Sequence, residues 1–260
     1  MDSEASIEFI DVVVEVAGRR FLDGVSFVIP AGQTVVIGGA PGSGKSFIPR
    51  LVLGLPGVQE GDGIRLWGDV KVGGQSVFDL DENGLCQLRR RIGMVMWNGG
   101  LIDNMDVERN ITLPLVYHAL GGGRGVDVGA RCRAEAEELG IAHLLRSGLR
   151  PVALNREEKV RVAMARARID DPAIFMVDDP FGGMDDATVR SLVGAMCRPL
   201  GRGVQTRIIT TSRLLPLLGA GERFWLVEEG ALVDLGEGDR MRLSDHAWIQ
   251  AELEGAVPPL

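Results

Sequence analysis

The chain has 260 residues, of which 45% are hydrophobic and 25% charged, a balance that is ordinary for a folded globular protein and excludes a mostly disordered one. The formal net charge of −8 argues against a nucleic acid as a partner, because nucleic-acid-binding domains usually carry a basic face. The three cysteines form no CxxC pair and no apolar run approaches ~20 residues, so we expect no disulfide framework, zinc site or membrane-spanning helix.

Short runs rich in Val and Ile, bounded by glycine or proline, predict the strands of the fold. In chain order they are 7–16, a stretch ending at Pro30, 34–38, two between 63 and 78, 174–177, 207–211, 224–227 and 231–235. Helices are expected at 47–55 and 131–147, and the stretch from about 85 to 170 is mostly helical in pattern. A GGGRG loop at 121–125 separates helices inside that block, and the last 20 or so residues carry no clear signal. This order predicts an α/β fold that begins with antiparallel strands and carries a helical insert.

A glycine-rich loop follows the apolar run 34–38 and precedes the first predicted helix. Residues 39–46 fit the pattern G-x-x-x-x-G-K-[ST] at every fixed position, and the strand before and the helix after are the context that the pattern requires. Glycines let backbone N–H groups curl around phosphate oxygens, so we expect Lys45 to reach the β and γ phosphates and Ser46 to hold Mg²⁺. The residues expected to contact the nucleotide are Gly39, Pro41, Gly42, Ser43, Gly44, Lys45, Ser46 and Phe47. Pro49 falls early in the following helix and should perturb its first turn.

An acid at the end of an apolar strand is the second element that such a phosphate site needs. Asp178 follows the run IFMV and is the expected second Mg²⁺ ligand beside Ser46. Taken alone, Asp178 could equally be a turn or helix-capping residue. The three histidines are scattered without ligand spacing, so we expect no role for them in metal binding.

Five blocks of sequence, in this order, resemble the ATP-binding subunits of ABC transporters. They are GGAPGSGKS (38–46), LRRRIGMVMW (88–97), RPVALNREEKVRVAMARAR (150–168), DPAIFMVDDPFGGMD (171–185) and IITTSR (208–213). The resemblance implies a P-loop NTPase core of the RecA-like kind, with an N-terminal antiparallel β region and an inserted α-helical subdomain. A single nucleotide-binding domain is expected over 1–240, with the helical subdomain at about 85–170 and a C-terminal tail at 241–260. ATP and Mg²⁺ are the implied cofactors.

Several positions depart from the catalytic pattern of that family. Trp97 stands where the family has a glutamine that contacts Mg²⁺ and the attacking water, and an indole N–H can only donate. Asp179 stands in place of the catalytic glutamate, with its carboxylate one methylene farther back. Ser212 replaces the histidine that touches the γ-phosphate, and no aromatic residue that could stack on adenine is evident near Val16. At Phe47 the chain also lacks a hydroxyl that is common in the family.

The signature motif, LSGGQ in the family, is replaced by 154–158, LNREE. Arg156 and Glu157 put bulk where glycines let a helix approach the partner's γ-phosphate in a head-to-tail dimer. Asn155 and Glu158 have the spacing of a capping box. We therefore expect this helix to satisfy its own N-terminal amides.

These features predict a degenerate ATP-binding subunit of an ABC transporter that binds Mg-ATP with little or no hydrolysis. It would serve a membrane permease on the cytoplasmic face of the inner membrane, as a homodimer or a heterodimer with another such subunit. The stretch 98–115 resembles the Mla/Mce-type lipid-transport ATPases, and the region 98–116 is expected to dock the permease unless it is ordinary core. The first alternative is a slow but active ATPase with Asp179 as general base. A P-loop kinase or switch unrelated to transport is a second.

Overall fold

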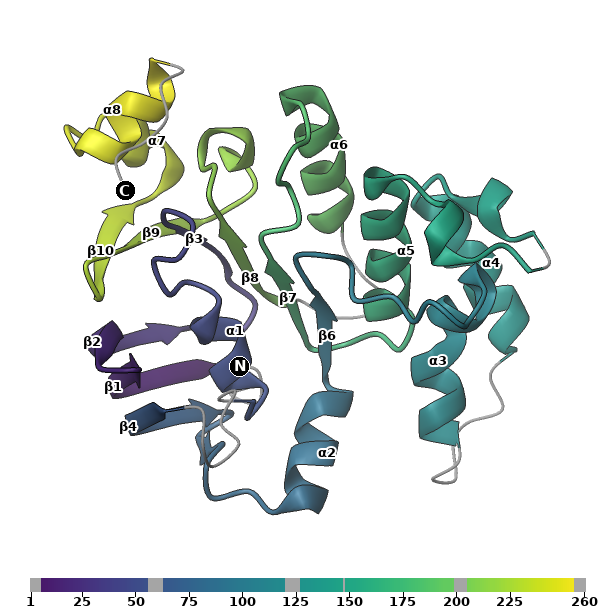
Figure 1. The fold of residues 1–260 in the computed structure, drawn as a ribbon, viewed down its shortest axis with the longest axis horizontal. Helices are drawn as coiled ribbons and strands as arrows, with labels where there is room; N and C mark the ends of the chain where they lie inside the picture. The colour runs from purple at the N-terminus through teal and green to yellow at the C-terminus, as the bar shows by residue number, and fades with distance from the viewer. Residues whose placement is uncertain (1–5, 56–62, 120–126, 147, 199–204, 255–260) are drawn as a thin grey trace.

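The computed structural model describes residues 6–55, 63–119, 127–146, 148–198 and 205–254 (Figure 1). The strands are β1 Ile7–Val16, β2 Arg19–Ile29, β3 Thr34–Gly38, β4 Ile64–Val72, β5 Gln75–Ser76, β6 Ile92–Val95, β7 Ile174–Asp178, β8 Thr206–Thr211, β9 Arg223–Glu228 and β10 Ala231–Gly236. The helices are α1 Phe47–Val52, α2 Glu82–Arg90, α3 Val107–Ala119, α4 Val128–Glu138, α5 Arg156–Arg168, α6 Asp186–Met196, α7 Gly238–Arg242 and α8 Ala247–Leu253. Three single 3₁₀ turns, η2 Ala142–Leu144, η3 Pro151–Ala153 and η4 Leu215–Leu217, complete the described elements.

The N-terminal strands form an antiparallel sheet with the order β2-β1-β4-β5, as expected from the sequence. Apolar residues of β1, among them Ile7, Phe9 and Val14, are buried on one face of this sheet. They share a core cluster with Ile48 and Leu51 of α1 and with one face of the second sheet. Helix α1 therefore lies between the two sheets, and the residues that precede it are held in place from both sides.

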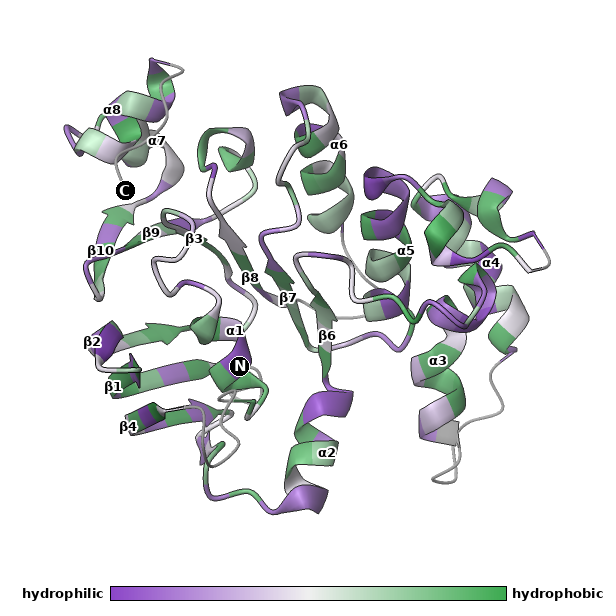
Figure 2. Cartoon of the chain, in the orientation of Figure 1, coloured by the Kyte–Doolittle hydropathy of each residue, from purple (hydrophilic) through white to green (hydrophobic). Residues whose placement is uncertain are grey.

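The second sheet has the order β10-β9-β3-β8-β7-β6, and its strands run parallel except for the antiparallel edge strand β10. Every residue of β3 and of β7 is buried, and Figure 2 shows this central part of the sheet as mostly hydrophobic. Such uninterrupted apolar strands are typical of a parallel sheet that is covered on both faces. In such a sheet the residues that follow the strands meet at one edge, which is where ligands bind in open α/β sheets. The loop after β3, the end of β7 and the residues after β8 gather there.

The stretch expected to be mostly helical, 85–170, contains a strand of the central sheet. Residues Ile92–Val95 form β6, which pairs in parallel with β7. This four-residue run, which follows an arginine-rich helix end, is too short to show the alternation of a strand. Only its pairing with β7 reveals that it is a strand. The helices on the far side of β6, drawn at the right of Figure 1, are α3, α4 and α5.

The helix expected at 131–147 is shorter than its amphipathic pattern suggested. Helix α4 ends at Glu138, and Gly140 follows in a left-handed conformation with φ 70°. Residues 142–144 form the separate turn η2. The GGGRG loop at 121–125 lies outside the described residues.

The C-terminal residues, expected to be a tail without clear structure, fold back onto the domain as α7 and α8. Trp248 and Ile249 of α8 are buried and belong to the main core cluster. A seven-residue helix offers too few turns for a visible period, so it could not be predicted from the local pattern. Among the helices of the described segments, none is long and apolar enough to cross a membrane.

Candidate functional site

The glycine-rich loop connects β3 to α1 at the carboxyl edge of the parallel sheet. Gly42 and Gly44 have φ values of 78° and 103°, which side chains other than glycine rarely adopt. A Cβ atom on Gly44 would lie 2.7 Å from the carbonyl oxygen of Phe21 in β2, so only glycine fits there. The loop is thus a bare backbone turn that begins in the sheet and ends at α1, as the phosphate-loop pattern predicts.

Pro49 alters the first turn of α1, as expected. Because proline has no N–H, the carbonyl of Lys45 cannot accept its usual bond from residue 49. It accepts instead from the backbone N–H of Ile48, at 3.2 Å, and the α-helix begins at Phe47. The first turn is therefore tighter than an α-helical turn.

Lys45 is buried in the loop, with 5% of its surface exposed. Its Nζ atom lies 3.2 Å from the carbonyl oxygen of Ala40 and 3.4 Å from Oδ2 of Asp179. A buried ammonium group needs such partners, because an isolated charge is costly to desolvate. The lysine is therefore held in the loop by a carboxylate where an incoming phosphate would compete for it.

Ser46 and Asp178 lie side by side, as expected of two ligands of one cation. The Ser46 hydroxyl donates to Oδ1 of Asp178 at 2.7 Å, and the Thr210 hydroxyl of β8 donates to the same oxygen at 2.8 Å. Asp178 is buried, with 4% of its surface exposed. A hydroxyl and a carboxylate beside a phosphate loop are the donor set that Mg²⁺ takes in nucleotide sites, so these residues fit that ion.

Asp179 occupies a constrained position next to this pair. Its φ of 40° is left-handed, and its backbone N–H donates to the carbonyl oxygen of Thr210 at 3.0 Å. Oδ2 faces Lys45, whereas Oδ1 is buried and has no hydrogen-bond partner within the described chain. The carboxylate therefore has one buried acceptor oxygen that no described group uses.

Phe47, expected to contact the nucleotide, belongs to an aromatic cluster at the foot of the loop. Its ring centroid lies 5.4 Å from that of Phe21, and the Arg19 guanidinium lies 4.7 Å from the centroid of Phe21. Phe21 and Arg19 are not among the residues that the sequence predicts at the nucleotide. The family resemblance points only to the neighbourhood of Val16 for a side chain that could stack on a base. The alternation of β2 places both side chains on the same face, which was the available signal.

Two positions expected to depart from the catalytic pattern of the resembled family, Trp97 and Ser212, follow strands β6 and β8 of the parallel sheet. Trp97 follows β6 and is 58% exposed, so its indole faces solvent. The turn after it is held by Arg166 of α5, which donates to the carbonyl oxygens of Gly100 and Gly99 at 2.7 and 3.0 Å. Burial lowers the pKa of Arg166. Ser212 directly follows β8, whose Thr210 contacts Asp178.

Helix α5 caps its own N-terminus, as its sequence predicted. The Asn155 side chain accepts from the backbone N–H of Glu158 at 2.9 Å, and the Glu158 carboxylate accepts from the backbone N–H of Asn155 at 2.9 Å. Glu157 pairs with Arg161 at 2.7 Å. The Arg156 guanidinium lies over Gly182, where a Cβ atom would come within 3.3 Å of it. Two of the backbone amides at this helix end, those of Asn155 and Glu158, are therefore occupied by side chains of the same helix.

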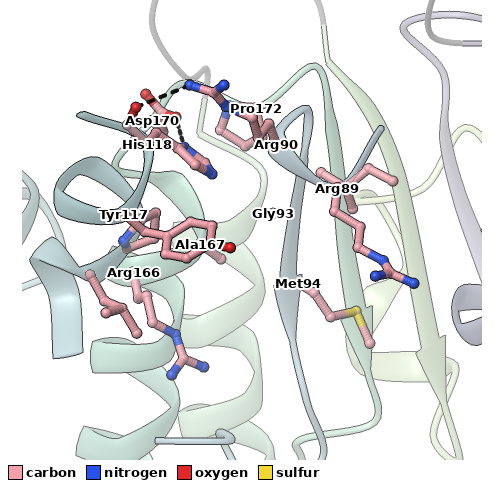
Figure 3. A pocket seen from close by; sticks show the side chains of 13 residues that line it. Arg89, Arg90, Gly93, Met94, Tyr117, His118, Arg166, Ala167, Asp170 and Pro172 are labelled. Carbon is pink, nitrogen blue, oxygen red and sulfur yellow. Dashed lines mark hydrogen bonds and ion pairs between the residues drawn. The ribbon is translucent and has the colours of Figure 1, made fainter. Parts of the chain in front are cut away.

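A hollow of about 330 Å³, away from the phosphate loop, lies between α2, β6, α3 and α5 (Figure 3). Its lining combines the basic residues Arg89 and Arg90 with the apolar and aromatic residues Leu113, Pro114 and Tyr117. His118 closes one end through a 2.6 Å contact between Nδ1 and Asp170 Oδ2.

The region expected to dock a partner, 98–116, contributes only part of this hollow. Leu113 and Pro114 line it, whereas Ile111 is fully buried in the core. Val116 and Tyr117 are 50% and 62% exposed. Ile111 is therefore ordinary core, whereas docking through the exposed residues of this region stays a prediction.

Comparison with known proteins gives relatives of one kind. The chain is 28% identical over 256 residues to the methionine import ATP-binding protein MetN of Rhizobium johnstonii, covering 98% of this chain and 66% of that protein. It is 30% identical over 170 residues to the cell division ATP-binding protein FtsE of Escherichia coli, covering 65% of this chain and 71% of that protein. The structure of a bacterial Atm1-family ABC exporter with ATP bound superposes with a TM-score of 0.77 at 25% identity, covering 96% of this chain and 42% of the exporter chain. The chain thus spans just under two thirds of the MetN length.

The match to a family model supports the same assignment. The model described as ABC transporter matches residues 22–182, which is more than half of the chain and includes the phosphate loop, α5 and Asp178. The chain belongs to the ABC transporter family, whose ATP-binding domains bind ATP with Mg²⁺.

Proposed function

We propose that this chain is an ATP-binding subunit of an ABC transporter that binds Mg-ATP and hydrolyses it slowly or not at all. Binding rests on the intact half of the site, in which Lys45 is buried in the loop and Ser46 contacts Asp178. When bound, Mg²⁺ would neutralise phosphate charge between Ser46 and Asp178. Lys45 would exchange its contact with Asp179 for one with the phosphates.

The capping box at the start of α5 is the observation that best supports the proposal of weak hydrolysis. In an active dimer this helix end would present free amides to the partner's nucleotide, but Asn155 and Glu158 satisfy two of them here. The glutamate and histidine positions hold Asp179 and Ser212, and Trp97 faces solvent. Each lost transition-state contact typically costs about 10²–10³ in rate, although such factors do not simply multiply.

The same site also supports a second candidate, a slow ATPase with Asp179 as general base. The unpartnered Oδ1 of Asp179 favours this alternative, because a base needs a free oxygen to accept a proton. The two candidates differ in whether Asp179 participates in chemistry or only pairs with Lys45. The residues at 97, 155–158 and 212 differ from the catalytic pattern of the family. These differences make the first candidate, binding with little or no hydrolysis, the better supported one.

We further propose that the subunit dimerises and docks a membrane permease through the hollow between α2 and α3. Exposed Tyr117, which lines the hollow together with Arg89 and Arg90, suits a short apolar helix with an acidic end. That contact would hold the chain on the cytoplasmic face of the inner membrane. The lipid class of substrate rests only on the resemblance of 98–115 and stays a prediction, since the matched relatives are named for methionine import and cell division.

The deciding experiment measures Mg-ATP binding and turnover of the chain together with its permease, beside the variants Lys45→Ala and Asp179→Asn. We expect binding without turnover in the wild type, and loss of binding in Lys45→Ala. Turnover that Asp179→Asn abolishes would instead establish the slow ATPase. If neither binding nor turnover occurs, the proposal of an ATP-binding subunit is wrong. Lipids that copurify with the complex test the substrate class.

A further inference from the structure

The C-terminal helix α8 carries a carboxylate that is used away from its own helix. Glu252 accepts two backbone hydrogen bonds, from the N–H of Leu214 at 3.0 Å and from the N–H of Leu215 at 3.0 Å. These are the amides at the start of the turn η4, which have no partner within the turn itself. A residue 37 or 38 positions later in the chain therefore caps this turn.

The two capped amides belong to the 211–215 segment, which leads from the end of β8 into η4. Ser212 lies in it, and the Arg213 guanidinium donates to the carbonyl oxygen of Met184 at 2.8 Å and pairs with Asp186. Met184 and Asp186 follow Asp179 by a few residues. The 211–215 segment is thus tied at one end to the chain beyond Asp179 and at the other end to α8.

A direct contact joins the 211–215 segment to the phosphate loop. Leu214 is fully buried, and a Cβ atom on Gly38 would lie 2.8 Å from Cδ1 of Leu214. Gly38 is the last residue of β3, immediately before the loop. The leucine side chain therefore packs against the backbone from which the loop starts, so movement of Leu214 changes the space available to Gly38.

Helix α8 also lines a pocket next to the phosphate loop. Trp248 is buried and lines a pocket of about 510 Å³ together with Pro41, Gly42 and Ser43 of the loop. At the start of α8, His246 accepts from the backbone N–H of Trp248 through Nδ1 and contacts Glu228 through Nε2 at 3.1 Å. One short helix thus contacts the end of β9 and the 211–215 segment, and it shares a pocket with the loop.

We propose that α8 is a strap that regulates the nucleotide site, with Glu252 as a positioning residue that holds the 211–215 segment, and through Leu214 the phosphate loop, in place. Release of the strap loosens Gly38 and the loop. Docking of α8 and nucleotide binding therefore favour each other. The nucleotide arm of this proposal rests on the proposed function, whereas the coupling from Glu252 to the loop does not.

The test uses the full chain and the variants Glu252→Ala, Glu252→Gln and Glu254→Ala. Glu252→Ala removes both acceptors, and Glu252→Gln keeps the shape and one carbonyl acceptor, so it should rescue in part. Glu254 is exposed at the end of the same helix and provides the matched control for loss of charge. Hydrogen exchange followed by mass spectrometry reads the backbone amides of 38–46 and of 214–215 without nucleotide.

In Glu252→Ala we expect exchange to become about tenfold faster at 214–215 and also in the loop 38–46, with a smaller effect in Glu252→Gln and none in Glu254→Ala. Faster exchange confined to η4 and α8 would overturn the strap, because Glu252 would then be only a local cap. Should Glu252→Ala not fold, the pattern in Glu252→Gln decides in the same way.

A second experiment measures the affinity of the chain for a fluorescent ATP analogue in the presence of Mg²⁺. We expect Glu252→Ala to raise Kd by about threefold to thirtyfold, with Glu254→Ala unchanged. An unchanged Kd in Glu252→Ala, beside a wild type that binds, would overturn the coupling to nucleotide. If the wild type itself does not bind the analogue, the proposed function fails, and the exchange measurement still decides whether Glu252 holds the loop.

Discussion

Replacing Asp179 by asparagine should destabilise the nucleotide-free protein and increase its stabilisation by nucleotide. The carboxylate lies 3.4 Å from the Lys45 ammonium, and the two side chains are only 18% and 6% exposed. At an effective dielectric constant of about 20, a pair at this distance attracts by about 5 kcal/mol before desolvation is subtracted. Lys45 keeps its contact with the carbonyl oxygen of Ala40, which limits the loss.

We therefore expect Asp179→Asn to lower the free energy of unfolding by about 2 kcal/mol, which corresponds to a fall in Tm of about 4–8 °C for a chain of this size. Phosphate oxygens would replace the missing carboxylate when nucleotide binds. The rise in Tm on adding Mg²⁺ and a non-hydrolysable ATP analogue should then be larger in the variant than in the wild type. The extra rise should equal most of the Tm difference between the two nucleotide-free proteins.

Thermal unfolding with and without the analogue measures both quantities, and the analogue removes any contribution from turnover. The control is Asp234→Asn, which breaks an ion pair with Arg223 whose two side chains are each 45% exposed. An exposed pair contributes under about 1 kcal/mol, so its Tm should change little. Equal Tm values for wild type and Asp179→Asn, with equal shifts on adding the analogue, would refute the pairing of Lys45 with Asp179.

Three further predictions concern other parts of the fold. Asn155→Ala removes the cap of α5 and should cost about 1 kcal/mol in a urea titration, and a change within error would contradict the capping box. Arg168→Met leaves Glu135 buried without its 3.1 Å partner and should cost about 3–5 kcal/mol; an unchanged urea midpoint would show that the pair contributes nothing. Burial raises the pKa of Cys132 to about 11, with the charge of Glu108 as a smaller cause. Because the thiolate, which alone reacts, is then about a thousandth of the thiol at pH 8, Cys132 should resist iodoacetamide until unfolding, and rapid labelling of the native protein would contradict this.

The segments that form the candidate phosphate site could be located from the sequence because their signals are local. The loop 39–46 carries its glycines, lysine and serine in one short run, and Asp178 ends a strand of continuous apolar residues. The adjacency of Ser46 and Asp178 followed from the rule that parallel strands end at one edge of a sheet. The capping box at Asn155 and Glu158 was visible for the same reason, since both partners lie within one turn.

The long-range contacts around this site could not be predicted, because they join residues far apart in the chain. Nothing near Glu252 indicates that it caps a turn 37 residues earlier, and the contact between Arg166 and Gly100 spans 66 residues. Strand β6 is recognisable only once β7 lies beside it. Each of these depends on which elements pack together and not on the local pattern.

By itself, the sequence determined where most strands and the loop 39–46 lie along the chain, and that Asp178 ends an apolar strand, because backbone preference, apolar periodicity and motif spacing all act over a few residues. Only the tertiary structure decided that Lys45 faces Asp179, that Leu214 packs on Gly38 and that Trp248 of α8 lines a pocket with the loop. Those contacts form because burial of apolar surface brings distant segments together, and the polar groups enclosed there must then find partners.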